Sequence, residues 1–268
     1  MKDGFPAFGG FSGSLSLLDI PPLDLRQVEI IKGAASTFYG AGAIAGVVNF
    51  ISKSPEEKPV TNLIFNQTSA LGTDFSIFNS RKFDKFGYTF LGSVNYQKEY
   101  DVDDDDFTEL PKTKSFNINP RLFFTPDEKT RFTVGNSTTY QKRQGGDVFV
   151  VRGQSDGVHQ YFENNDSIRN ITTVQYDRDF SEGRKIVARQ SLAFFSREIS
   201  IPNYRFEGRQ FNSYTDISYF QPIKNHALVF GFNAVREQFR EQTFSITGKR
   251  DETRTTIGGY VQDAFDIT

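Results

Sequence analysis

The sequence lacks several residue types and motifs, and each absence excludes a class of structure or function. Among its 268 residues there is no cysteine and no tryptophan, and the single methionine is Met1. Without cysteine there are no disulfides and no thiolate metal sites. The net charge of −2 leaves no basic excess for phosphate, so we expect no nucleic-acid partner.

Long apolar segments are also missing. No run approaches the roughly eighteen consecutive apolar residues that a membrane helix needs. The opening residues MKDGFPAFGG lack the apolar region of a signal peptide. We therefore expect either that the protein stays in the cytoplasm or that the sequence is not a complete precursor.

Patterns that carry catalysis are equally scarce. The two histidines, His159 and His226, fall in a predicted long loop and a predicted short turn on opposite rims. No serine–histidine–acid arrangement, phosphate loop or HExxH motif is visible. We expect no enzyme and no covalent cofactor.

Aromatic residues, in contrast, are abundant: there are 29 Phe and 11 Tyr. Both types favour β-strands, and amphipathic aromatics favour membrane interfaces. Composition alone leaves two readings open, a Phe-rich β core and a membrane barrel.

From Val60 onward, apolar and polar residues alternate with period two, which indicates strands with one apolar and one polar face. We expect roughly ten strands of about ten residues each, the length that crosses a tilted barrel wall. On the best example, the apolar face holds Phe116, Ile118, Leu122 and Phe124, and the polar face holds Asn117, Asn119 and Arg121.

The lengths of the connections favour the barrel over a soluble sandwich. Short and long connections alternate along the chain. The predicted short turns are 83–85, 125–130, 181–185 and 221–226, and the longer stretches are 101–112, 144–167, 196–209 and 237–254. Outer-membrane barrels have short turns on one rim and long loops on the other. We place the apolar faces toward lipid and the polar faces toward a wet lumen.

Residues 1–55 differ from the rest. They are rich in glycine, and a strand-like run at Val28–Ile31 is followed by small residues and a second run at Val47–Ile51. The pattern is Asp3-Gly4, VEII (28–31), then Gly33, Ser36, Tyr39-Gly40, Ala43, Ala45-Gly46 and VVNFI (47–51). It resembles the end of the plug domain of TonB-dependent outer-membrane receptors, with Ala45 and Phe50 as small departures. Gly33, Tyr39, Gly40, Gly46 and Asn49 carry the plug motif.

The resemblance implies a division of the chain. Residues 1–55 would be the C-terminal part of a plug, 56–59 a linker, and 60–268 the first part of the β-barrel. The fold class is therefore mainly β, a partial transmembrane up-and-down barrel of antiparallel strands preceded by part of a small α+β plug. Since such transporters have about 22 strands, we expect a fragment of a receptor.

The resemblance also implies a function. Family members sit in the outer membrane of Gram-negative bacteria and import scarce nutrients, usually ferric siderophores or cobalamin. The TonB–ExbB–ExbD complex drives import through a TonB box, which would precede Met1. Outer-membrane lipid and a small-molecule ligand would be the other partners. The alternatives are a structural or adhesive outer-membrane barrel and, third, a soluble β-sandwich enzyme.

Three segments are candidates for binding. In the family the region of residues 5–14 reaches the plug apex, so Phe8, Phe11, Ser12 and Ser14 are ligand candidates; packing inside the plug is the alternative. Arg152, His159 and Tyr161, in the longest outer loop, suit an anionic ferric chelate or an ordinary surface loop.

The acidic stretch DVDDDDF (101–107) makes Asp103 and Asp105 weak calcium candidates. Cobalamin-importing members bind calcium in such loops, but the spacing is not that of an EF-hand. A solvated acidic loop is the competing interpretation.

Overall fold

The computed structural model describes residues 1–6, 22–32, 46–243 and 248–265. Two sheets account for its strands: a two-stranded antiparallel sheet and a ten-stranded sheet. The first consists of β1 (Leu25–Lys32) and β2 (Gly46–Ser52), and the 3-10 turn η2 (Pro22–Asp24) leads into β1. None of the helices in the described ranges is long and apolar enough to span a membrane.

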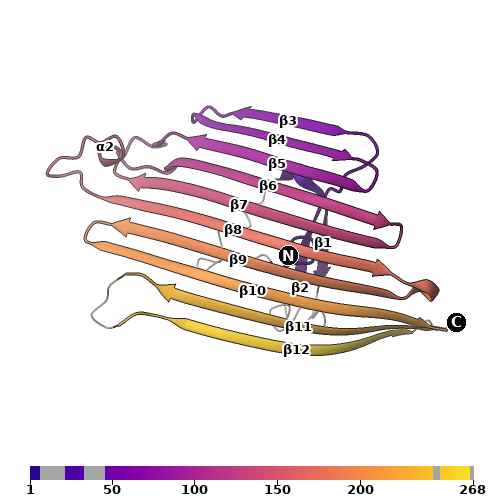
Figure 1. Cartoon of the computed structure of the whole chain (residues 1–268). Coiled ribbons are helices and arrows are strands. Elements are labelled where there is room, and N and C mark those ends of the chain that lie inside the picture. Colours follow the sequence, from indigo (N-terminus) through magenta and orange to yellow (C-terminus); the bar gives the residue numbers. More distant parts are fainter. Residues whose placement is uncertain (7–21, 33–45, 244–247, 266–268) are drawn as a thin grey trace.

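The ten-stranded sheet is an antiparallel meander in which every strand pairs with its neighbours in sequence, in the order β3 to β12 (Figure 1). The strands are β3 (Val60–Gln67), β4 (Gly72–Lys82), β5 (Phe86–Gln97), β6 (Lys112–Asp127), β7 (Thr130–Gly146), β8 (Phe162–Asp179), β9 (Lys185–Ile201), β10 (Tyr204–Ile223), β11 (His226–Glu241) and β12 (Glu252–Phe265). Such a chain of neighbour pairings is the topology of an up-and-down barrel wall. The predicted strand number is confirmed, although most strands are longer than the expected ten residues.

The predicted short turns lie on one rim as expected, and the long connections lie on the other, where the β3–β4 connection (68–71) is also short. In Figure 1 the connections β4–β5, β6–β7, β8–β9 and β10–β11 lie at one edge of the sheet, and those that carry α2 (Val148–Val151) and the other longer loops lie at the opposite edge. We call these the turn rim and the loop rim. On the turn rim, η4 (Ser181–Gly183) forms part of the β8–β9 connection.

One predicted long loop, 196–209, is wrong. β9 and β10 stay paired up to Ile201 and Tyr204, so that only Pro202 and Asn203 form the connection. Asn203 takes a positive φ of 62°, which a tight turn requires and asparagine tolerates. The β9–β10 hairpin therefore stays paired almost to its tip, because each strand supplies the other's hydrogen-bond partners.

The two faces of the sheet differ as the alternation predicts. We call the face that contacts the β1–β2 sheet the inner face, and the opposite one the outer face. On β6, Asn117 and Asn119 of the inner face are buried, whereas Leu122 of the outer face is 62% exposed. The inner face is not wholly polar, because Phe78 and Leu91 are about the most buried side chains, each 1% exposed.

Candidate functional site

The Asp3-Gly4 dipeptide forms a turn that clamps the start of the chain onto β2. Asp3 and Gly4 both have positive φ angles, 54° and 79°. The carboxylate of Asp3 accepts hydrogen bonds from the backbone N and the hydroxyl of Ser52, each at 2.8 Å. Asn49, 6% exposed, accepts from the Gly4 amide and donates to Glu29 of β1. These bonds explain physically why Asp, Gly and Asn stand at these positions.

Asp24 joins this small sheet to the barrel wall. Its side chain is 4% exposed and forms an ion pair with Lys2 at 2.8 Å. The same carboxylate oxygen accepts a hydrogen bond of 2.7 Å from Asn119 of β6, a residue 95 positions later in the chain. A buried carboxylate needs such partners, because the desolvation of an unpaired buried ion costs on the order of several kcal/mol.

Arg121, two residues further along β6, makes the second connection. Its guanidinium lies 3.5 Å from the carboxylate of Asp3, and both side chains are largely buried, at 14% and 19% exposed. It also donates to the backbone oxygen of Lys53. We call these contacts, Asp24–Asn119 and Asp3–Arg121, the β6 seam.

Lys53 and the apolar inner residues complete the packing next to the seam. The ammonium of Lys53 lies 5.0 Å from the ring centroid of Phe78, at a cation–π distance. Lys53 also donates to the backbone oxygen of Leu23. The buried Phe78 on the otherwise polar inner face is therefore covered by a residue that follows the small sheet, Lys53.

A polar cavity of about 510 Å³ adjoins the seam. Across it, Arg189 of β9 pairs with Asp216 of β10 at 3.2 Å, and the side chain of Asp216 is only 4% exposed. The lining includes charged side chains of both sheets, namely Asp3, Arg26, Arg121, Arg131, Asp177, Arg189 and Asp216. The contacts of Asp3 and Arg121 between the small sheet and the wall thus lie beside a space that admits water.

Two connections on the loop rim are joined to each other. The Thr108 amide donates to the Gly146 oxygen, and the Gly146 amide donates back to the Thr108 hydroxyl, both at 2.9 Å. Val148 donates to the oxygen of Asp106 at 2.9 Å. The β5–β6 connection (98–111) and the β7–β8 connection (147–161) therefore form one unit, which we call the loop pair.

Gly146 makes the close approach of the loop pair possible. Its φ is +112°, and a Cβ at this position would lie 2.7 Å from the backbone oxygen of Tyr161 and 2.9 Å from the Cα of Phe162. Because these are backbone atoms, they cannot rotate away. Only glycine fits here without moving the chain.

The three loop residues expected to bind a ligand all lie in or beside the loop pair. Arg152 forms an ion pair with Glu99 at 3.2 Å, with the arginine half-exposed and the glutamate buried. The ring of His159 stacks on Phe149, with centroids 4.4 Å apart, and Tyr161 stacks on Phe107 at 5.7 Å. The loop pair presents aromatic surface with positive groups beside it; a ligand role for these residues stays a prediction.

The neighbouring Asp156 changes the pKa of His159. Its Nδ1 lies 3.0 Å from the Asp156 carboxylate, and this hydrogen bond raises the pKa of His159. The amide and ring of His159 and the amide of Val158 in turn lower the pKa of Asp156 to about 2. The Asp156 carboxylate is therefore ionised at neutral pH and hydrogen-bonded to the His159 ring within one turn.

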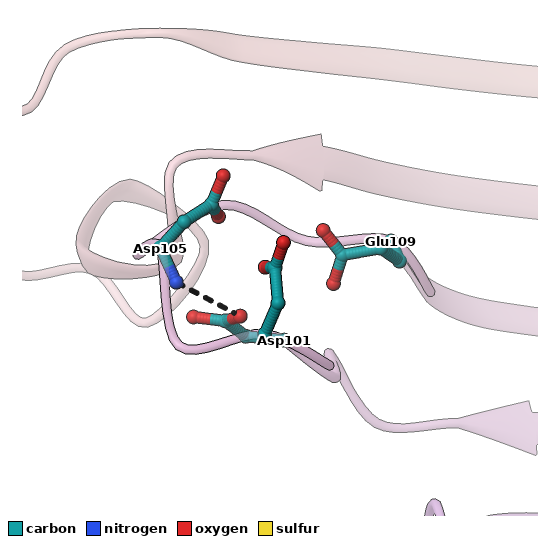
Figure 2. Close-up of side chains that lie close together, drawn as sticks. Asp101, Asp105 and Glu109 are labelled. Atoms are coloured by element: carbon teal, nitrogen blue, oxygen red, sulfur yellow. Dashed lines mark hydrogen bonds between the residues drawn. The ribbon is translucent and has the colours of Figure 1, made fainter.

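The acidic stretch places more carboxylates together than the sequence suggested. Candidate ligand atoms of Asp101, Asp103, Asp105 and Glu109 all lie within 4.8 Å of one another. Figure 2 shows Asp101, Asp105 and Glu109 gathered in the β5–β6 connection. The charge of Asp105 raises the pKa of Asp103. Oxygen ligands suit calcium, and calcium binding at Asp103 and Asp105 stays a prediction.

The remaining candidates lie outside the described residues. These are the ligand candidates Phe8, Phe11, Ser12 and Ser14 and the motif residues Gly33, Tyr39 and Gly40. Gly46, in contrast, starts β2 with a φ of +115°. The β6 seam was not predicted: the polar face of β6 pointed to Asn119 and Arg121, but no sequence signal singled out Asp24 as their partner.

A protein-family comparison bears on the first part of the chain. Residues 1–47 match the profile of the TonB-dependent receptor plug domain. The described residues of this segment include Asp3, Asp24 and all of β1, but only the first two residues of β2. Asp3 and Asp24 therefore lie inside the match, whereas their partners Ser52, Asn119 and Arg121 lie beyond it.

Similar proteins extend the comparison over most of the chain. Two curated relatives, both named iron-regulated outer membrane virulence protein, come from Vibrio cholerae serotype O1 strains and are 22% identical over 262 residues. The match covers 92% of this chain and 38% of each relative. The chain thus spans about two fifths of the length of the curated relatives it matches.

Solved structures share the fold. The ferripyoverdine receptor of the outer membrane of Pseudomonas aeruginosa superposes with a TM-score of 0.77 at 13% identity, covering 100% of this chain and 43% of that one. The siderophore receptor PirA from the same species gives a TM-score of 0.68 at 17% identity, covering 93% and 42%. At these identities the similarity concerns the fold.

Proposed function

We propose that this chain is part of a TonB-dependent outer-membrane receptor and serves the import of a ferric siderophore, driven by the TonB–ExbB–ExbD complex. The plug-domain match over residues 1–47 and the fold shared with solved receptors support this. The choice of ligand is supported by the relatives, one named as iron-regulated and others as receptors for ferripyoverdine or as siderophore receptors. Transport, and not catalysis, is the activity of this family. Cobalamin remains the other ligand to be tested.

The observation that carries the proposal is the β6 seam. A plug that must move during import needs contacts that hold it at rest and that water can replace when it is pulled. Asp24–Asn119 and Asp3–Arg121 are such contacts, because both are polar and because Asp3 and Arg121 line a cavity of about 510 Å³. Force on the plug would exchange them for hydrogen bonds to water.

The loop pair is our proposed capture surface. Ferric siderophores are bulky chelates, and aromatic rings with adjacent cationic groups suit a ligand that is both flat and anionic. Tyr161 and His159 supply rings, and Arg152 supplies a half-exposed guanidinium. In the proposed arrangement Phe8, Phe11, Ser12 and Ser14 meet the ligand from the plug side.

We also propose the division of the chain into plug (1–55), linker (56–59) and barrel (60–268). It is supported by the change of sheet, since β2 ends at Ser52 and the wall begins at Val60. The linker residues would let the plug move without disturbing β3.

The proposal is tested by growth of the source bacterium with its gene deleted, under iron chelation. Ferripyoverdine or ferric enterobactin should support growth only when the gene and TonB are both present. Cyanocobalamin uptake is measured in parallel. Growth and uptake that do not depend on TonB would contradict import and favour a structural or adhesive barrel.

A matched variant separates binding from transport. Asp24→Ala should leave the siderophore bound at the cell surface but change the rate of its uptake, because the seam lies away from the loop pair. Unchanged uptake with normal binding would show that the seam plays no part in plug movement.

A further inference from the structure

We propose that the outer face at the turn rim binds one anionic phospholipid, with an acyl chain in an aromatic groove across β5–β7 and its phosphate at Arg81. The proposal concerns the surface opposite to the plug. It is independent of the imported ligand and of the TonB complex. It rests on a groove, an arginine at its edge and the position of both at the membrane boundary.

The groove is built from two rows of outward side chains. In the row nearer the turns, Phe86 stacks on Phe124 with ring centroids 4.6 Å apart, and Phe124 lies 6.1 Å from Phe132. Leu122 and Val134 lie in the next row, and both are substantially exposed. The volume is about 450 Å³, within the range of small-molecule pockets.

The chemistry of the lining suits an acyl chain. Its side chains come from Phe and Tyr rings, Leu122 and Val134, completed by Gly87. The one side-chain polar atom, the Tyr88 hydroxyl, is already occupied, since it donates to Asn79 at 2.7 Å. A water molecule in the groove would therefore find few hydrogen-bond partners, whereas a hydrocarbon chain would lose none.

Arg81 stands at the edge of this groove with its charge available. It is paired in register with Tyr88, which lines the groove. Its guanidinium lies 5.0 Å from the ring centroid of Phe83, another lining residue. Among the described residues, no carboxylate pairs with it. A phosphate diester beside the groove would complement this charge.

The level in the membrane agrees with this assignment. The lining includes Phe83, which lies in the β4–β5 connection, and Phe86, the first residue of β5. The β4–β5 connection lies on the turn rim (Figure 1). Aromatic residues of barrels gather where acyl chains meet headgroups, and long basic side chains extend to that level. A lipid seated here would have its chain along the wall and its phosphate near the turns.

Arg178 provides a matched control. It also lies on the turn rim, 5.6 Å from the ring of Phe180. It does not line the groove, and it already donates to the Thr130 hydroxyl at 3.3 Å. Removing either arginine changes the charge of the rim by the same amount, but only Arg81→Gln removes charge at the groove.

The test is native mass spectrometry of the receptor purified from outer membranes in mild detergent. Phosphatidylglycerol or phosphatidylcholine is added at equal concentrations. We expect preferential retention of phosphatidylglycerol, and Arg81→Gln should lower that retention about fivefold, the ratio that corresponds to about 1 kcal/mol for one basic residue near an anionic surface. Arg178→Gln should leave it unchanged.

A second variant tests the groove itself. Val134→Trp fills it and should reduce retention of both lipids, while heat-modifiable migration on a gel confirms that the barrel has folded. Equal retention of the two lipids by the unaltered receptor, or equal losses in Arg81→Gln and Arg178→Gln, would overturn the proposal. Retention of detergent alone would do the same.

Discussion

The β6 seam and the loop pair both join segments that are distant in sequence, but they use different chemistry. The seam relies on buried side chains: Asp24 is 4% exposed, and Arg121 is 14% exposed. The loop pair relies on backbone hydrogen bonds around Gly146, with its side chains largely in solvent. A buried ionic contact loses much when one partner is removed, whereas an exposed one loses little. The stability of the docked plug should therefore depend on charged side chains, and the stability of the loop pair on backbone geometry.

The largest expected effect is that of Asp24→Ala. The change leaves the Lys2 ammonium and the Asn119 amide without their acceptor, which costs about 3–5 kcal/mol for a broken buried pair. Hydrogen exchange of the β1 and β2 amides in the receptor should accelerate accordingly. Asp24→Asn, which keeps an oxygen acceptor, should lose less. Equal acceleration in both variants would show that the retained oxygen acceptor contributes nothing, and exchange in Asp24→Asn as slow as in the unaltered receptor would show that the charge of Asp24 is irrelevant.

Next comes the comparison of two arginines. Arg121→Gln should reduce the stability of the docked plug by about 2 kcal/mol, the contribution of a hydrogen-bonded charge. Arg152→Gln should change stability by less than about 1 kcal/mol, because its guanidinium is half-exposed. Protease resistance of the 53–59 segment and of the 147–161 loop reports on the two sites. A larger loss of stability in Arg152→Gln than in Arg121→Gln would contradict the expectation that the buried contact contributes more.

Gly146→Ala should loosen the loop pair by about 1–3 kcal/mol, because its Cβ would clash with backbone atoms and its φ is positive. Gly153 is the control: its φ is +75°, but a Cβ there meets nothing within 4 Å. Gly153→Ala should therefore cost only about 1 kcal/mol. Siderophore affinity and hydrogen exchange of the loops are the readouts. Identical effects would mean that conformation, and not the close contact, matters.

The smallest effect concerns pH. Because the pKa of His159 is raised, the stability contributed by its protonated ring beside Asp156 is fully present below the ordinary histidine pKa and is lost as the pH rises through the raised value. The Asp156 pKa of about 2 preserves the carboxylate's own contribution until the pH falls toward that value. Asp156→Asn should lower the pKa of His159, measured by NMR of labelled histidine. An unchanged titration would remove Asp156 as the cause.

Much of the fold could be predicted because its signal is local. Alternation on β6 assigned Asn119 and Arg121 to one face and Leu122 and Phe124 to the other, and the structure confirms both. The connection at 196–209 was misjudged, because a polar hairpin looks like a loop when only its composition is considered. Whether such a segment pairs is decided by its partner strand.

The candidate site was less predictable. The Asp3-Gly4 turn and Asn49 belong to a motif with fixed spacing, so the sequence pointed to them. Asp24 belongs to no pattern, and its partner Asn119 lies 95 positions away. The acidic loop shows the same limit, since Asp101 and Glu109 join Asp103 and Asp105 only after the chain has folded back.

The amino-acid sequence by itself determines the alternation of the barrel wall. It decides which side chains share a face, roughly how many strands there are, and which rim has the short turns. These follow from the period of two in an extended chain. Tertiary structure alone decides which inward polar groups meet the plug and which outward rings enclose a groove. Such contacts depend on register and on packing between distant segments, and no local period encodes them.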